Sequence, residues 1–145
     1  MKRFGFPLER VRRWRAEQAS VEDLKLGQLL AEKAWLQASK RQVEWEGRQS
    51  ELQVLGQPAL EASELHHLDS YRLHIQSRVR ELENRQRECE AQVVAQRQCV
   101  LEARRRFELL DRLRHKALKE WRAAGNKEQE DLAAELFLAK SRRNT

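Results

Sequence analysis

Residues 65–124 decide the fold of this chain, and they read LHHLDSYRLHIQSRVRELENRQRECEAQVVAQRQCVLEARRRFELLDRLRHKALKEWRAA. Along this stretch apolar residues recur alternately every three and four positions, which is the repeat of a helix that packs along a partner helix. The positions of the repeat are Leu65, Leu68, Arg72, Ile75, Val79, Leu82, Gln86, Cys89, Val93, Gln96, Val100, Ala103, Phe107, Leu110, Arg114, Ala117, Trp121 and Ala124. Because neither Pro nor Gly interrupts it, the repeat predicts one continuous helix, roughly 90 Å long at 1.5 Å per residue.

The composition also indicates long helices rather than a compact domain. Charged residues make up 36% of the 145 residues, and the chain contains only 5 Gly and 2 Pro. Such a composition is typical of long helices and coiled coils. The formal net charge of +6 favours acidic partners, although charge alone does not distinguish a protein from a lipid surface or a nucleic acid.

Proline and glycine mark where the helices are expected to begin and end. Pro7 suits the first turn of a helix, because the amide at that position needs no intrahelical partner. Gly56 favours a helix C-terminal cap, and Pro58 cannot continue the same helix but can open the next one. A second, weaker stop stands at residues 125–126, where the sequence is Gly-Asn.

The sequence therefore predicts an all-α fold in a single domain over residues 1–145. Two long helices are expected to form an antiparallel coiled-coil hairpin. The first helix covers residues 7–55 approximately, the turn lies at 56–58, and the second helix covers about 59–143 with a possible break at 125–126. The second helix is longer, and it overhangs at the end of the hairpin that carries the two termini.

The apolar series of the first helix is expected to face the second helix. Its members are Ala16, Ala19, Leu26, Leu30, Ala34, Ala38, Trp45, Leu52 and Leu55. Folding about residues 56–58 pairs this helix with the second helix only up to about Glu108. The repeat from Glu108 to Ala124 is therefore expected to lack cover from the chain itself and to meet a partner. Farther along, one side of the helical pattern carries Leu132, Leu136 and Ala139.

No set of residues in the sequence predicts catalysis or a bound metal. No two histidines stand at the i, i+4 spacing that places two ligands on one helix face; they are His66, His67, His74 and His115. Cys89 and Cys99 lie about 15 Å apart along one helix, too far to form a disulfide, which indicates a reduced protein. With no phosphate-binding loop and no nucleophile beside a base, we expect neither an enzyme nor a cofactor.

The basic residues do not by themselves predict nucleic-acid binding. They cluster at residues 10–15 and 104–106, but carboxylates are interspersed almost everywhere else and no recognition motif is present. The sequence also lacks a signal-peptide pattern and any run of about 18 apolar residues. We therefore expect a cytoplasmic protein that binds no nucleic acid and does not insert into a membrane.

The start of the chain suggests a family. Residues 4–15 read FGFPLERVRRWR and resemble the start of FliJ-type proteins, the small coiled-coil component of the bacterial flagellar type III export apparatus. The whole chain is similar to that family in its length, its two-helix plan and its Leu- and Arg-rich C-terminal helix. Two departures are Arg12, where the family often has Leu, and residues 133–134, which are both Ala where the family tends to show an acidic pair.

This resemblance implies a non-enzymatic stalk and adaptor. Its implied partners are the hexameric flagellar export ATPase, the export gate membrane protein and export chaperones, so that the protein would be peripheral at the inner face of the cell membrane. The positions similar to the family's gate-binding patch are Leu68, Tyr71 and Ile75. The end that carries the termini would enter the ATPase ring, and its expected contact residues are Arg10, Arg13, Leu110, Arg114, Ala117 and Trp121.

Two other interpretations remain open at this point. The first is a basic coiled-coil module that self-associates through the uncovered part of the second helix and binds nucleic acid or membrane. The second keeps the stalk role but places it in a virulence type III secretion system.

Overall fold

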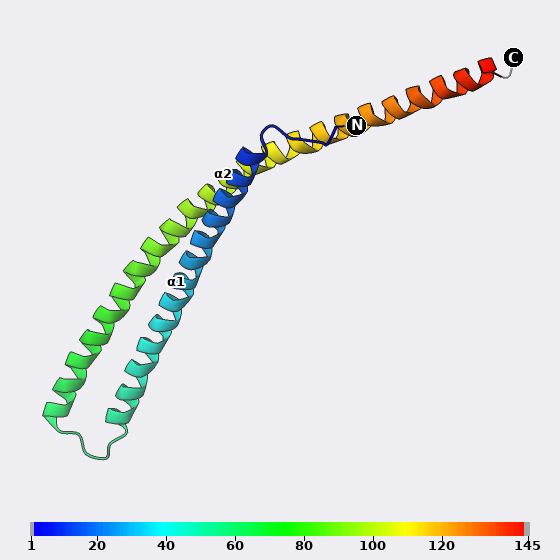
Figure 1. Cartoon of the computed structure of the whole chain (residues 1–145). Helices are drawn as coiled ribbons and strands as arrows, with labels where there is room; N and C mark the ends of the chain where they lie inside the picture. The colour runs from blue at the N-terminus through cyan, green and yellow to red at the C-terminus, as the bar shows by residue number, and fades with distance from the viewer. Residues whose placement is uncertain (1, 144–145) are drawn as a thin grey trace. The chain divides into compact units, whose positions relative to one another are not determined.

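The protein is a helical hairpin, seen in a computed structural model that describes residues 2–143 (Figure 1). Helix α1 comprises Glu9–Leu55 (47 residues), and helix α2 comprises Ala62–Arg143 (82 residues). The described part of the chain contains no β-strand. These observations confirm the predicted all-α fold with two long helices, of which the second is the longer.

The connection between the helices is longer than the predicted turn at residues 56–58. The amide of Gly56 donates to the carbonyl oxygen of Leu52 over 2.9 Å and ends α1 at the expected place. Helix α2 begins at Ala62 rather than near residue 59. The reason is a cap: the side chain of Glu64, the third residue of α2, accepts a hydrogen bond from the amide of Glu61 over 3.4 Å, as the third helical residue does in a capping box.

Helix α2 continues through residues 125–126, so the weak stop that the sequence offers there is not used. Gly125 keeps a helical backbone with no positive φ, and it is buried. A single Gly inside a helix costs only about 1 kcal/mol relative to Ala, which packing against other parts of the chain can offset.

The chain divides into two compact units, each containing a part of both helices. The terminal unit consists of Met1–Ser20 and Leu101–Thr145, and the turn unit consists of Val21–Val100. The turn unit holds the main hydrophobic cluster. Its buried members are Leu36, Leu82, Cys89 and Val93, with Leu26, Leu29 and Val43 packed around them.

The inward face of α2 is the one that the repeat predicts. Leu68, Leu82, Cys89, Val93 and Val100 are all buried, and each stands in the predicted series. Cys89 also donates a hydrogen bond from its thiol to the carbonyl oxygen of Leu29 over 3.5 Å.

The inward face of α1 differs from the predicted series beyond Leu26. The residues that face α2 are Leu29, Leu36 and Val43, whereas Leu30, Ala34, Ala38, Trp45, Leu52 and Leu55 are exposed. The prediction is wrong because long polar side chains alternate with the apolar ones on the true inward face. Lys33 and Lys40 reach Glu90 and Glu83 across the helix pair, over 3.9 and 3.1 Å, with their apolar stems beside the core.

Shortening one leucine from each apolar series on α1 distinguishes the observed inward face, which contains Leu36, from the predicted one, which contains Leu52. Leu36 is 2% exposed and Leu52 is 66% exposed. We expect Leu36→Ala to lower the free energy of unfolding by about 2–5 kcal/mol, as for other buried leucines. Leu52→Ala should change it by no more than about 0.5 kcal/mol. Urea unfolding of both variants, followed by circular dichroism, measures this. Equal losses of unfolding free energy would contradict the observed packing.

Candidate partner-binding surfaces

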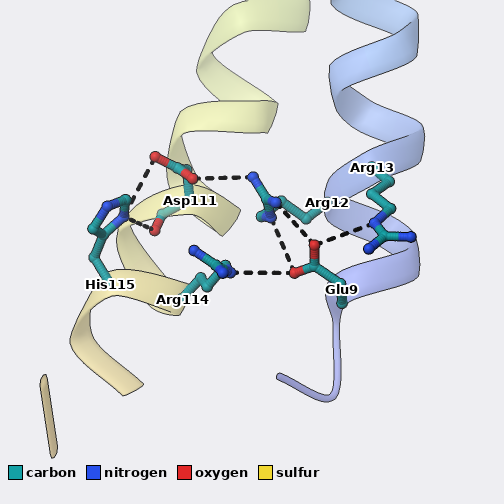
Figure 2. Close-up of polar contacts among 6 residues, drawn as sticks. All are labelled: Glu9, Arg12, Arg13, Asp111, Arg114 and His115. Atoms are coloured by element: carbon teal, nitrogen blue, oxygen red, sulfur yellow. Dashed lines mark hydrogen bonds and ion pairs between the residues drawn. The ribbon is translucent and has the colours of Figure 1, made fainter. Parts of the chain in front are cut away.

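A polar network joins the start of α1 to α2 in the terminal unit (Figure 2). Arg12 donates to both carboxylate oxygens of Glu9, over 2.8 and 3.1 Å, and to Oδ1 of Asp111 on α2 over 3.2 Å. Arg114 of α2 lies 3.4 Å from the same Glu9 carboxylate. The network thereby sets the register of the two helices at this end.

The network also fixes the charge of Glu9. The hydrogen bond from Arg12 lowers the pKa of Glu9 from 4.5 to about 2, although partial burial acts in the opposite direction. The charge of Arg12, a hydrogen bond from Arg13 and the charge of Arg114 add to the lowering. Glu9 is the first residue of α1, where a carboxylate is also favoured by the helix dipole.

The chain before α1 covers α2 farther than the sequence predicts. Residues 2–8 are not helical, and the ring of Phe4 lies 5.8 Å from the ring of Trp121 between centroids. Figure 1 shows this segment running along α2 in the terminal unit. An extended chain spans about 3.3 Å per residue against 1.5 Å in a helix, so a few residues reach several turns along α2.

The expectation that α2 lacks cover from Glu108 to Ala124 is therefore wrong. The prediction treats the whole stretch as uncovered because it pairs the first helix with the second residue by residue. In the structure, cover reaches Trp121 and the buried Gly125. The uncovered part of α2 is the C-terminal segment, residues 126–143, in which every residue is exposed.

The six residues expected to contact an ATPase ring all lie in the terminal unit, but they differ in exposure. Arg10 and Arg13 are exposed. The other four are half-buried: Leu110, Arg114, Ala117 and Trp121. Of these, Arg114 pairs with Glu9 and Trp121 packs against Phe4. Only the two arginines therefore present their side chains fully to a partner.

The C-terminal segment is a surface that the predicted contact residues did not include. Its large apolar side chains are exposed: Leu132 58%, Leu136 65%, Phe137 73% and Leu138 59%. The signal in the sequence was the recurrence of Leu132, Leu136 and Ala139 on one side. The stretch from Glu108 to Ala124 has a stronger apolar repeat, so periodicity alone places the partner surface there instead.

The three residues expected to contact an export gate lie close together in the turn unit. Leu68 is 4% exposed and is held between the helices. Tyr71 is half-buried, and its hydroxyl accepts a hydrogen bond from the Ser50 hydroxyl over 3.4 Å. Ile75 lies against Gly47, where an added Cβ would approach Ile75 to 3.1 Å.

Tyr71 separates two grooves between the helices of the turn unit. The groove toward the turn has a volume of about 410 Å³ and is lined by Ser50, Val54, Gln57, Glu64, His67, Leu68 and Tyr71. The groove on the other side has a volume of about 500 Å³ and is lined by Glu44, Gly47, Arg48, Glu51, Tyr71, Arg72, Ile75 and Gln76. An ion pair between Arg72 and Glu51 bridges the helices beside the second groove. Tyr71 and Ile75 are thus reachable from solvent, and Leu68 forms part of a groove wall.

Within residues 2–143, no three His, Cys, Asp or Glu side chains are placed to hold a metal ion. Burial raises the pKa of the Cys89 thiol, so that this thiol stays protonated. In the same part of the chain, neither helix has a stretch both long and apolar enough to cross a membrane.

Comparison with known proteins identifies no relative: no family model, curated protein or solved structure matches the chain. What the protein binds must therefore be inferred from its own surfaces. Two stand out, namely the grooves beside Tyr71 in the turn unit and the C-terminal segment in the terminal unit.

The lowered pKa of Glu9 predicts a defined dependence of stability on pH. A carboxylate with a lowered pKa stabilises the fold above its unfolded pKa, and this contribution is lost as the pH falls from about 4.5 to about 2. We expect Glu9→Gln to lower the melting temperature at pH 7, and the difference from wild type to shrink toward zero near pH 2. Thermal unfolding at a series of pH values measures this.

Glu17→Gln, which changes an exposed carboxylate of the same helix, is the matched control and should leave the melting temperature nearly unchanged throughout. A Glu9→Gln difference that stays constant from pH 7 to pH 2 would contradict the assignment.

Proposed function

We propose that this protein is a non-enzymatic stalk and adaptor of the bacterial flagellar type III protein export apparatus. In this role it binds the hexameric export ATPase and the export gate protein and assists export chaperones, at the inner face of the cell membrane. The observation that carries the proposal is the C-terminal segment of α2, in which every residue from 126 to 143 is exposed. The FliJ-like start of the chain supports the same role.

The terminal unit is the proposed contact with the ATPase ring. Its C-terminal segment offers a single helix with exposed Leu132, Leu136 and Phe137, which suits insertion into a narrow ring better than a helix pair does. Arg10 and Arg13 supply exposed positive charge on α1. Arg114 and Trp121 support the contact by holding Glu9 and Phe4 against α2, and the half-buried Leu110 and Ala117 lie on the same helix.

The grooves beside Tyr71 are the proposed contact with the gate. Grooves of this kind accept apolar side chains of a partner, with a few polar groups at the rim to fix orientation. Tyr71 supplies both an apolar ring and a hydroxyl, and tyrosine is among the residues that most often dominate binding energy. Ile75 and Leu68 add apolar walls on either side.

Removing the C-terminal segment tests the ATPase contact. We expect a chain ending at Asn126, which keeps the covered part of the terminal unit, to bind the export ATPase at least about thirtyfold more weakly than the full chain. The reason is that even one dominant apolar contact contributes about 2 kcal/mol or more. Surface plasmon resonance on the purified ATPase measures this. Unchanged affinity of the shortened chain would overturn the proposed insertion.

Substitution of Tyr71 tests the gate contact separately. Tyr71→Ala should weaken capture by the soluble domain of the gate protein about tenfold or more while leaving ATPase binding unchanged. Leu73→Ala is the matched control, because Leu73 is exposed on the same helix but lines neither groove. Equal effects of the two substitutions on gate capture would argue against the grooves as the contact.

A further inference from the structure

The free face of the C-terminal segment continues a face that is already an interface within the chain. Trp121 packs against Phe4 of the chain before α1, and Gly125, one turn farther along α2, is buried. Leu132 and Leu136 follow Gly125 by seven and eleven residues, which places them on the same side of α2. The same apolar face therefore runs on past the last covered residue, with nothing from the described chain against it.

The charges of this segment are divided between its two halves. The first half, residues 126–134, is net acidic, with Glu128, Glu130 and Asp131 against Lys127. The second half, residues 135–143, is net basic, with Lys140, Arg142 and Arg143 against Glu135. A parallel second copy would set like charges side by side, whereas an antiparallel copy would set each half against the opposite half of its partner.

We propose that the C-terminal segments of two copies of this chain pair antiparallel and form a symmetric dimer. With the two-fold axis near residue 134, Leu132 of one copy lies beside Leu136 of the other. Glu128 then faces Lys140 of the other copy across the pair. The overlap runs from residue 126 to residue 143 and stops at the buried Gly125, so the pairing uses the whole C-terminal segment.

The charge pattern favours a second copy over the other partners that could cover an apolar helix face. An anionic lipid surface or a nucleic acid would meet the three carboxylates of the net acidic first half, which would repel it. The contact is short, so it belongs to the small interfaces that associate weakly, with a dissociation constant on the order of tens of micromolar. The proposal does not depend on the export role, since it concerns the purified chain alone.

Exchanging charges tests the pairing directly. We expect the full chain to show a monomer–dimer equilibrium by analytical ultracentrifugation. The variants Glu128→Lys with Asp131→Lys, and Lys140→Glu with Arg143→Glu, should each shift to monomer, with at least tenfold weaker self-association. An equimolar mixture of the two should again form dimers, because one segment then carries a net positive charge and the other a net negative charge.

Leu136→Asp removes the apolar contact and should also give monomer, whereas Leu73→Asp, at an exposed position of the turn unit, should leave the dimer intact. Circular dichroism verifies that each variant keeps its helices. The proposal is overturned if the full chain is monomeric at all concentrations, if the charge variants dimerise as wild type does, or if Leu73→Asp rather than Leu136→Asp abolishes the dimer.

Cross-linking determines the orientation of the pair. In a background with Cys99→Ser, copies carrying Gln129→Cys are mixed with copies carrying Ala139→Cys and oxidised mildly. An antiparallel pair places these two positions opposite each other, so mixed disulfides should predominate over those within either population. Predominance of Gln129→Cys homodimers would indicate a parallel pair and overturn the proposal.

Discussion

A pair of helices can bury only one face of each helix, and the whole structure depends on how well those two faces pack. The core is one layer of side chains, with Leu36 of α1 set among Leu82, Cys89 and Val93 of α2. Such a layer gains stability with length rather than with thickness. It also leaves most of each helix surface exposed, which explains why the candidate sites described here are open grooves and exposed helix faces.

Most of the fold could be predicted from the sequence, because large apolar residues dominate the inward face of α2. On that helix, no second apolar series competes with the one that contains Leu82, Val93 and Val100. On α1 two series compete, and the inward one is interrupted by Lys33 and Lys40, whose charged ends lie at the edge of the core. A search for apolar residues alone therefore selects the neighbouring, exposed series. The start of α2 was missed for a similarly local reason, the cap that Glu64 provides.

The candidate surfaces were predictable only in part. Hydrophobic periodicity correctly assigned Leu68 and Ile75 to the helix interface, but the grooves beside Tyr71 depend on small residues across from it, Gly47 and Ser50, which carry little signal by themselves. In the terminal unit, the extended chain before α1 occupies a face of α2 that was expected to receive a partner. How far a non-helical segment reaches depends on its backbone conformation, which neither composition nor periodicity specifies.

The two cysteines provide a way to time the separation of the helices. They lie on the same helix within the turn unit, yet Cys99 is exposed and Cys89 is buried against α1. A thiol reagent should label Cys99 at once, whereas Cys89 becomes accessible only when the helix pair opens around it. The labelling rate of Cys89 relative to that of Cys99 therefore reports how readily the turn unit opens, with the exposed Cys99 as the internal reference.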